Sequence, residues 1–268
     1  MIEQTRDGGQ HWTASPAPDL PAYPVDGNGG WHLRFGTALD GWLYGPQLYA
    51  THDGGKSWTV ARAASVTSLV SAGQSVWALE GSCPNGCSLS LERSDDAGRA
   101  WSRVNLPQLD RAGFAVPARV DATHGWILAW GPCTPSLGTS GVVAASSPSN
   151  VWVVCGGLPG AGQQLKQLSR SDDGGAHWTT SDLSSSGYVA DLAVTSASRG
   201  WLAFGRGPLS TTVDGGRTWR TSIENNESGM AFVRFVDPLH GWAASAQQLY
   251  RTSDGGMHWV TALTAVAS

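Results

Sequence analysis

The stretch RTSDGGMHW, residues 251–259, contains the turn motif that decides how this chain folds. The motif reads Ser/Thr-x-Asp-Gly-Gly-x-x-Trp, and five further copies occur upstream, one with alanine in place of the first glycine. The motif aspartates are Asp7, Asp53, Asp96, Asp173, Asp214 and Asp254. Their numbers differ by 46, 43, 77, 41 and 40, so one interval is nearly double the others. The doubled interval predicts a seventh, degenerate copy within GPCTPSLGTSG, which has lost the aspartate and the tryptophan.

A second signature runs in phase with the first, as a small polar turn, a tryptophan and a short apolar strand. Its tryptophans are Trp42, Trp77, Trp126, Trp152, Trp201 and Trp242. The last repeat divides into four short strands, MAFVRFVD, GWAASA, QLYRTSD and HWVTAL. About 40 residues with four strands are typical of a β-propeller blade, and no helical periodicity separates the strands. We therefore predict an all-β propeller of four-stranded antiparallel blades, with the motif turns between third and fourth strands.

The number of motifs predicts seven blades in a single domain over residues 1–268. The first motif has no inner strands before it, so residues 1 to about 20 are expected to form a hairpin in an incomplete or closing blade. A six-bladed ring with an extra hairpin is the alternative.

Composition excludes several classes of partner. The chain has 268 residues and a net charge of −4, without the concentrated positive charge that nucleic-acid binding requires. No apolar run is long enough to span a membrane, and the N-terminal sequence MIEQTRDGGQHW has no signal-peptide pattern. We expect a monomer without nucleic-acid partner or membrane span.

The motif itself is interpreted as a structural turn. Its aspartate can accept hydrogen bonds from backbone N–H groups of the same turn, and its glycines permit positive φ. A phosphate-binding loop needs a following helix and a lysine, and a calcium loop needs several alternating carboxylates. Six copies cannot all be active sites of one small domain, so the motif predicts no metal and no cofactor.

Four cysteines, Cys83, Cys87, Cys133 and Cys155, favour two disulfides over a zinc site, because no histidine lies near either pair in the sequence. Disulfides persist in oxidising compartments, which predicts an extracytoplasmic location: periplasmic, secreted or at the cell surface.

The six motifs are similar to the Asp-box, or bacterial neuraminidase repeat, of the sialidase-like propeller superfamily. Together with FVDPLHGW, they most resemble the photosystem II stability/assembly factor family and its bacterial relatives. The resemblance covers nearly the whole chain and implies the propeller fold. It does not specify an activity, because Asp-box propellers include sialidases, xyloglucanases, sortilin-type receptors and assembly scaffolds.

The sequence shows little sign of the residues that a sialidase-like active site would need. The resemblance would require an Arg-Ile-Pro phrase near the start, and the chain has none. Glycosidases need two facing carboxylates. Once turn aspartates are set aside, Asp191 with Tyr188 is the acid–hydroxyl pair at the start of an inner strand. No residue is therefore assigned a catalytic role, and this pair is retained as a candidate ligand contact.

Arginines recur in three inner strands. Arg34, Arg119 and Arg234 precede the blade tryptophan by 8, 7 and 8 residues. Such a cluster on one face would suit a carboxylate, a phosphate or an acidic partner, while the alternative is that each arginine ties down a neighbouring blade. We therefore predict a non-catalytic scaffold or assembly module that binds a protein, an acidic ligand or a carbohydrate over one face. The alternative is a sialidase-like glycoside hydrolase or a carbohydrate-binding propeller.

Overall fold

A computed structural model describes residues 2–20, 30–82, 88–106, 115–129, 140–158, 160, 163–183, 187–224 and 228–264. These residues form β-strands joined by turns, with no helix among them. Contacts divide the chain into two compact units, and each is described by itself. Unit 1 comprises Met1–Thr5 and Trp12–Trp130, and unit 2 comprises Arg6–His11 and Gly131–Ser268. The single domain over residues 1–268 stays a prediction.

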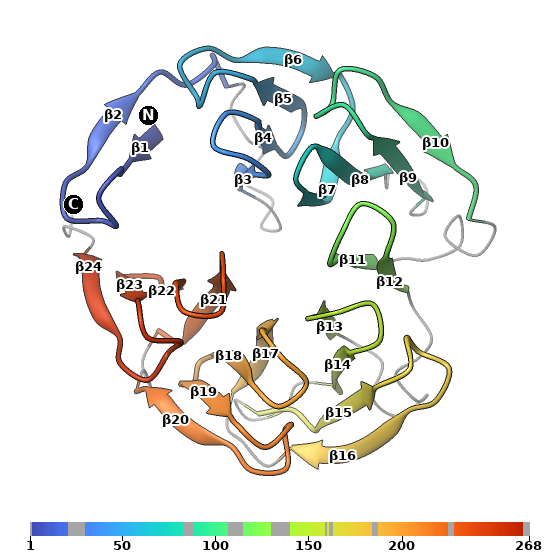
Figure 1. The fold of residues 1–268 in the computed structure, drawn as a ribbon, viewed down its shortest axis with the longest axis vertical. Helices are drawn as coiled ribbons and strands as arrows, with labels where there is room; N and C mark the ends of the chain where they lie inside the picture. Colours follow the sequence, from blue (N-terminus) through green and yellow to red (C-terminus); the bar gives the residue numbers. More distant parts are fainter. Residues whose placement is uncertain are drawn as a thin grey trace. The chain divides into compact units, whose positions relative to one another are not determined.

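Unit 1 contains two four-stranded antiparallel sheets and two pairs of strands (Figure 1). The first sheet has the order β3 (His32–Phe35), β4 (Gly41–Tyr44), β5 (Leu48–Thr51) and β6 (Thr59–Arg62). The second has the order β7 (Val66–Ala72), β8 (Ser75–Ser82), β9 (Ser88–Ser94) and β10 (Ser102–Val104). The pairs are β1 (Ile2–Gln4) with β2 (Thr13–Ser15), and β11 (Ala115–Arg119) with β12 (Gly125–Ala129).

Unit 2 contains three four-stranded antiparallel sheets, again in sequence order. The first is β13 (Ser140–Ala145), β14 (Val151–Gly156), β15 (Lys166–Ser171) and β16 (Thr179–Leu183). The second is β17 (Tyr188–Val194), β18 (Gly200–Gly205), β19 (Leu209–Thr212) and β20 (Arg220–Ile223). The third is β21 (Met230–Phe235), β22 (Gly241–Ser245), β23 (Gln248–Thr252) and β24 (Val260–Thr264). The four predicted strands of the last repeat are confirmed.

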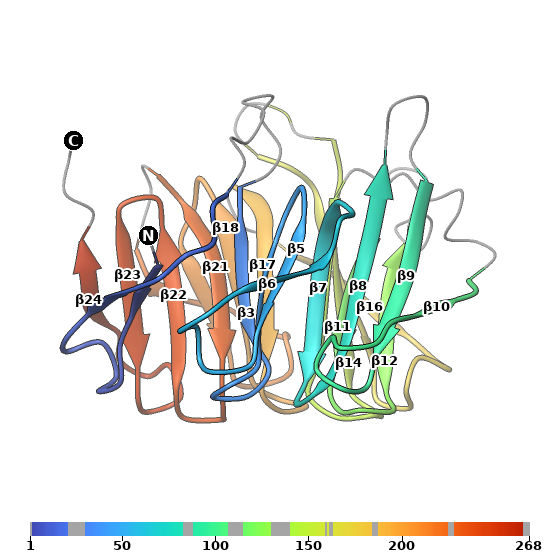
Figure 2. The ribbon, with the colours of Figure 1, turned by 90° about the horizontal axis from the view of Figure 1, so that it is seen from above.

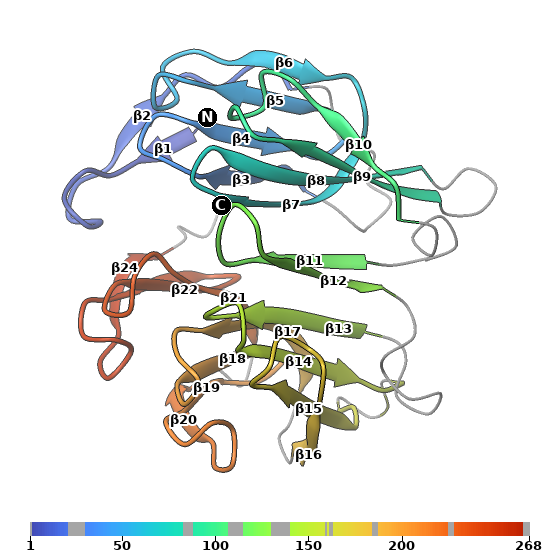
Figure 3. The same cartoon turned by 45° about the vertical axis from the view of Figure 1, so that its right-hand side comes forward.

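The described residues contain five four-stranded blades, so the predictions of seven blades and of six are both wrong. Figure 3 shows β11 and β12 as a pair without third and fourth strands of their own. The degenerate repeat expected there falls mainly at residues 130–139, outside the described residues. Among the described residues, the N-terminal strands β1 and β2 likewise pair with each other alone. Counting motifs overestimates the number of blades because a turn motif can close a hairpin that belongs to no complete sheet.

The second strand of each blade carries the core. Trp42, Trp152 and Trp201 are fully buried in β4, β14 and β18, and each neighbouring strand residue is apolar or small. A strand buried on both faces reads as a continuous apolar run, which is the pattern seen after each signature tryptophan. The fourth strands are mostly exposed, in keeping with their polar sequences.

In two of the motif turns the second glycine lies against the tryptophan of the preceding blade. In unit 1, a Cβ on Gly98 would lie 2.8 Å from Nε1 of Trp42, and that nitrogen donates a hydrogen bond to the Ala97 carbonyl at 3.2 Å. In unit 2, a Cβ on Gly256 would lie 2.4 Å from Nε1 of Trp201. At these two turns the motif and the signature tryptophan of the preceding blade form one contact, whereas the second glycine of a third turn, Gly216, lies against Leu168.

Candidate functional site

The motif turns satisfy their own polar groups. In the turn after β5, the Thr51 hydroxyl donates to Oδ1 of Asp53 at 2.9 Å and accepts the Gly55 N–H at 2.9 Å. The same carboxylate accepts the N–H groups of Lys56 and Ser57 at 2.9 and 3.0 Å. Side-chain and backbone hydrogen bonds from Ser57 lower the pKa of Asp53 well below its usual range. The carboxylate of Asp53 is therefore engaged by groups of its own turn.

The turns at the other described motifs repeat this arrangement. Their aspartates each accept the N–H four residues on, at 2.9 or 3.0 Å: Asp7, Asp96, Asp173, Asp214 and Asp254. In the last of them, hydrogen bonds from the backbone and side chain of His258 lower the pKa of Asp254 to about 2. An ionised, internally bonded carboxylate of this kind is a poor general acid at neutral pH.

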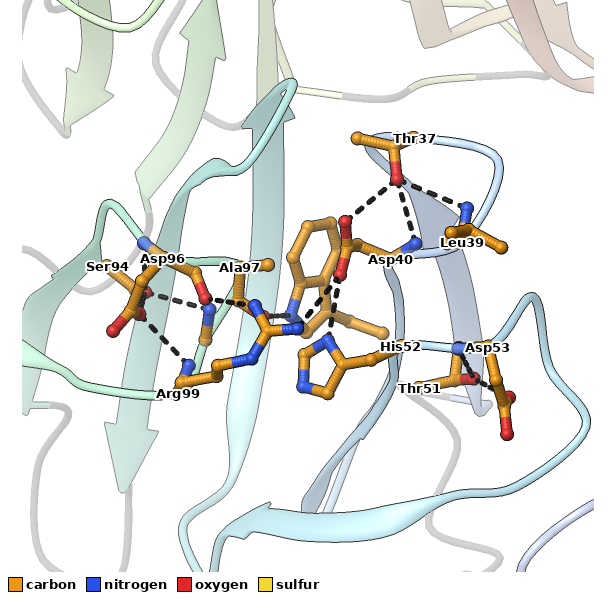
Figure 4. A network of polar contacts seen from close by, with 12 residues as sticks. Thr37, Leu39, Asp40, Thr51, His52, Asp53, Ser94, Asp96, Ala97 and Arg99 are labelled. Carbon is orange, nitrogen blue, oxygen red and sulfur yellow. Dashed lines mark hydrogen bonds and ion pairs between the residues drawn. The ribbon is translucent and has the colours of Figure 1, made fainter.

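Asp40 is the centre of a polar network between the two complete blades of unit 1. Figure 4 shows its carboxylate between the side chains of His52 and Arg99, which come from the motif turns of the first and second blades. Oδ1 lies 2.8 Å from Nδ1 of His52 and 3.8 Å from Nη2 of Arg99, while Oδ2 accepts the Thr37 hydroxyl at 2.9 Å. Burial raises the pKa of Asp40, but hydrogen bonds from His52 and Thr37 outweigh burial and lower it.

A second charged cluster joins the same two blades and was not anticipated from the sequence. Arg62, at the end of β6, binds Glu80 of β8 through Nε and through Nη2, the latter at 3.2 Å. It also lies 3.6 Å from Glu92 of β9. The available signal is that Glu80 and Glu92 interrupt the apolar stretches VWALEG and LSLERS. Two carboxylates thus lie close together, but both face one arginine.

Asp191 and Tyr188 lie in unit 2 on β17, as predicted, but the carboxylate faces the next blade. Asp191 is 8% exposed; its Oδ2 accepts the Val233 N–H at 2.9 Å and pairs with the Arg234 guanidinium. The ladder between β17 and β18 shifts register between Val189 and Asp191, a bulge that re-aims the strand. Tyr188 is half-buried at the first position of β17.

The three inner-strand arginines are not equivalent. Arg34 lies opposite Trp42 and Arg234 opposite Trp242, whereas Ala118, and not Arg119, lies opposite Trp126. A one-residue offset places a side chain on the other face of a strand. The guanidinium of Arg119 accordingly stacks 4.5 Å from the Trp77 ring of the preceding blade. Its Nε and Nη1 have no hydrogen-bond partner among the described residues, while Nη2 donates to the Ala122 carbonyl at 2.6 Å.

Arg34 differs from the other two arginines. It is half-buried on β3, and the described part of the chain gives it no ion pair. Burial, and then the charge of Arg34, lower the pKa of His32 two residues earlier. The charge of Arg34 thus acts on His32, and no carboxylate of the described residues pairs with it.

The cysteines give no support to the predicted location. Cys155 is buried in β14 and is disulfide-bonded, but Cys83, Cys87 and Cys133 lie outside the described residues. Neither predicted pair is shown. The prediction of an extracytoplasmic location is corrected: the described residues show one bonded cysteine and neither of the two predicted pairs, which does not define a compartment.

Three further observations concern the described residues. No three His, Cys, Asp or Glu side chains among them lie close enough to hold a metal ion. The described part also has no helix long and apolar enough to cross a membrane. A groove of about 310 Å³ lies between β9 and the end of β10 with the two residues that follow it, and it is lined by Leu89, Ser90, Leu91, Arg103, Val104, Asn105 and Leu106.

The antiparallel four-stranded blades and their repeated turns define the protein as a β-propeller. YCF48 from Cyanidioschyzon merolae is similar in structure at 20% identity, with a TM-score of 0.55, over 89% of this chain and 86% of its own. YCF48 bound to a D1 peptide is similar at 19% identity and a TM-score of 0.54, over 93% and 88%.

A third similar structure is an ancestral GH74 enzyme, at 12% identity and a TM-score of 0.70. The match covers 97% of this chain and 43% of that enzyme. No family model and no curated protein matches the sequence. In fold, this protein is a YCF48-like β-propeller, which confirms the resemblance to the photosystem II assembly factors at that level.

Proposed function

We propose that this protein is a non-catalytic propeller scaffold that binds a segment of a partner protein. The observation that carries the proposal is that other protein groups already bind the carboxylate of Asp191. The acid best placed for catalysis on an inner strand is held by the Val233 N–H and by Arg234. A glycosidase needs one carboxyl group as an acid and a second as a nucleophile or base, both free to face substrate.

Three further carboxylates, which lie between the two complete blades of unit 1, support the same proposal. Asp40 is held by His52 and Thr37, and Glu80 and Glu92 face Arg62. Similarity to the ancestral GH74 enzyme favours the hydrolase alternative, but at 12% identity it speaks for the fold alone. The peptide-bound YCF48 structure favours the scaffold, because a propeller of this fold there holds a peptide.

Arg34 is the contact residue we assign to partner binding. Of the three inner-strand arginines, Arg234 is paired with Asp191 and Arg119 stacks on Trp77, so both are interpreted as ties between blades. Arg34 keeps an uncompensated charge on a half-exposed strand. Tyr188, at the start of β17, remains a candidate contact in unit 2. We interpret the six motif turns as Asp-boxes whose role is structural.

The Asp191→Asn variant separates the two functions. A scaffold predicts no hydrolysis of xyloglucan or sialosides by either wild type or variant. It also predicts a loss of about 1–3 kcal/mol in the free energy of unfolding of the variant, because the half-exposed Arg234 loses its ion pair with Asp191. Urea unfolding and reducing-sugar release measure these quantities. Hydrolysis by wild type that disappears in a fully stable variant would establish the glycosidase instead.

A further inference from the structure

The blade formed by β7 to β10 has an outer edge that its own fourth strand does not cover. Strand β10 pairs with β9 through Ser102, Arg103 and Val104, which lie opposite Arg93, Glu92 and Leu91. The chain then leaves the ladder, so the backbone of Ser88–Ser90 has no strand partner on that side among the described residues. Figure 2 shows β8 and β9 extending side by side beyond the part of β9 that β10 covers.

The other four complete blades show that this edge is exceptional. In each of them the pairing with the fourth strand reaches the first residue of the third strand, namely Leu48, Lys166, Leu209 and Gln248. In β9 the pairing stops three residues short of Ser88. The groove of about 310 Å³ lies at this place, between β9 and residues 103–106.

An open strand edge has a definite chemistry. In an antiparallel ladder every second residue directs both its N–H and its C=O toward one neighbouring strand. At least one residue of Ser88–Ser90 therefore presents this pair of groups to the groove. Such an edge is completed by the backbone of another extended chain, and peptide recognition by strand addition uses the same geometry.

The two sides of the groove differ in polarity. Leu89 and Leu91 are buried, and Val104 and Leu106 pack with them in one apolar cluster. Ser90, Arg103 and Asn105 supply polar groups. Side chains alternate along a strand. An incoming segment would therefore place its apolar residues against the leucine and valine side chains, and its polar residues toward Ser90, Arg103 and Asn105.

The positive charge of Arg103 predicts which kind of polar residue the incoming segment carries at this position. Arg103 lies opposite Glu92, but Glu92 and its neighbour Glu80 both face Arg62 from the adjacent blade. The described residues leave Arg103 exposed and without an ion pair. A carboxylate on the incoming segment would complement it.

Resting on the proposed scaffold function, we propose that the partner is an extended segment with alternating apolar and acidic residues. It adds as a strand to the edge of β9, with its backbone paired to Ser88–Ser90 and an acidic side chain at Arg103. This names a surface in unit 1 on the outer side of a blade, away from the inner strand that carries Arg34.

Labelled short peptides test the proposal with the full chain. One peptide alternates valine and glutamate, a second alternates valine and lysine, and a third carries proline at the centre of the valine–glutamate sequence. We expect the valine–glutamate peptide to bind and the other two to bind at least about fivefold more weakly. Arg103→Glu should weaken the first peptide by about fivefold to tenfold, measured by fluorescence anisotropy.

Two controls keep the result specific. Arg220 is an exposed arginine at the start of β20, in a blade whose third strand, β19, is paired with β20 up to its first residue. Arg220→Glu should therefore leave peptide affinity unchanged. Bound peptide should slow hydrogen exchange of backbone amides within Ser88–Leu91. Binding without this protection, or equal affinity for the lysine peptide, would overturn the proposal. Partner binding that depends on Arg34 but not on Arg103 would overturn the groove assignment and leave the scaffold function standing.

Discussion

At the scale of single residues, one contact explains why the second blade requires glycine at position 98. Gly98 has a φ of +89°, and the space beside its Cα is filled by the Trp42 indole of the preceding blade. Any side chain there must both adopt a disfavoured backbone conformation and displace a fully buried tryptophan. The sequence pattern reveals the first requirement, but the tryptophan contact joins residues 56 apart and is visible only in the structure.

Gly98→Ala is therefore expected to lower the free energy of unfolding by about 2–4 kcal/mol, through strain and overpacking together. Gly73 is a matched control, since its φ is +61° and nothing lies within 4 Å of an added Cβ. Gly73→Ala should cost about 1 kcal/mol, from backbone strain alone. Chemical denaturation of both variants measures the difference, and equal losses would show that the Trp42 contact is not a constraint.

The motif carboxylates also predict how stability depends on pH. The pKa of Asp254 falls from 3.8 to about 2 on folding, so its contribution is fully present above pH 3.8 and is lost as the pH falls toward 2. Asp254→Asn should lower Tm by about 2–4 °C at pH 7, because the ionised acceptor is gone. The Tm difference between wild type and variant should shrink between pH 4 and pH 2. A difference that stays constant over this range would contradict the assignment.

At the scale of elements, strands and turns follow from local pattern, while the contacts between blades do not. The four strands of the last repeat and all six turn aspartates are where the periodicity predicts, because each hairpin is stabilised by residues close in the sequence. Register is harder: Arg119 lies seven rather than eight residues before its tryptophan, and that single residue moves it to the opposite face. The partners of Arg62 come from another blade, and no spacing rule identifies them.

Arg62→Met tests how far this cluster holds the first two complete blades together. Removing the arginine leaves Glu80 and Glu92 side by side with side chains 14% and 8% exposed. We expect a loss of about 2–3 kcal/mol, less than for a fully buried pair because Arg62 itself reaches solvent. The exposed pair of Arg93 with Asp95 serves as control, and Arg93→Met should cost less than about 1 kcal/mol.

A second arm isolates electrostatics from packing. Changing Glu80 and Glu92 to glutamine in the Arg62→Met background removes the unpaired charges and should recover part of the lost stability. No recovery would mean that the loss comes from the packing of the Arg62 stem against Trp101, over which the guanidinium lies at 5.9 Å.

At the scale of the whole molecule, the central claim is that a propeller with internally engaged carboxylates acts by binding. Sequence repeats predict the fold class, but they say little about function, because what repeats is what builds blades. The features that carry function are departures from the repeat. We propose that these are Arg34 on β3 and the edge of β9 beside Arg103, neither of which is paired among the described residues.

The most direct measurement is quantitative affinity purification from an extract of the source organism, using wild type, Arg34→Glu and Arg220→Glu as baits. The account predicts a protein that is retained by wild type and by Arg220→Glu, and that is depleted at least about fivefold with Arg34→Glu. Equal retention by all three baits, or no retained protein at all, would contradict the claim that this propeller is a scaffold with Arg34 in its binding surface.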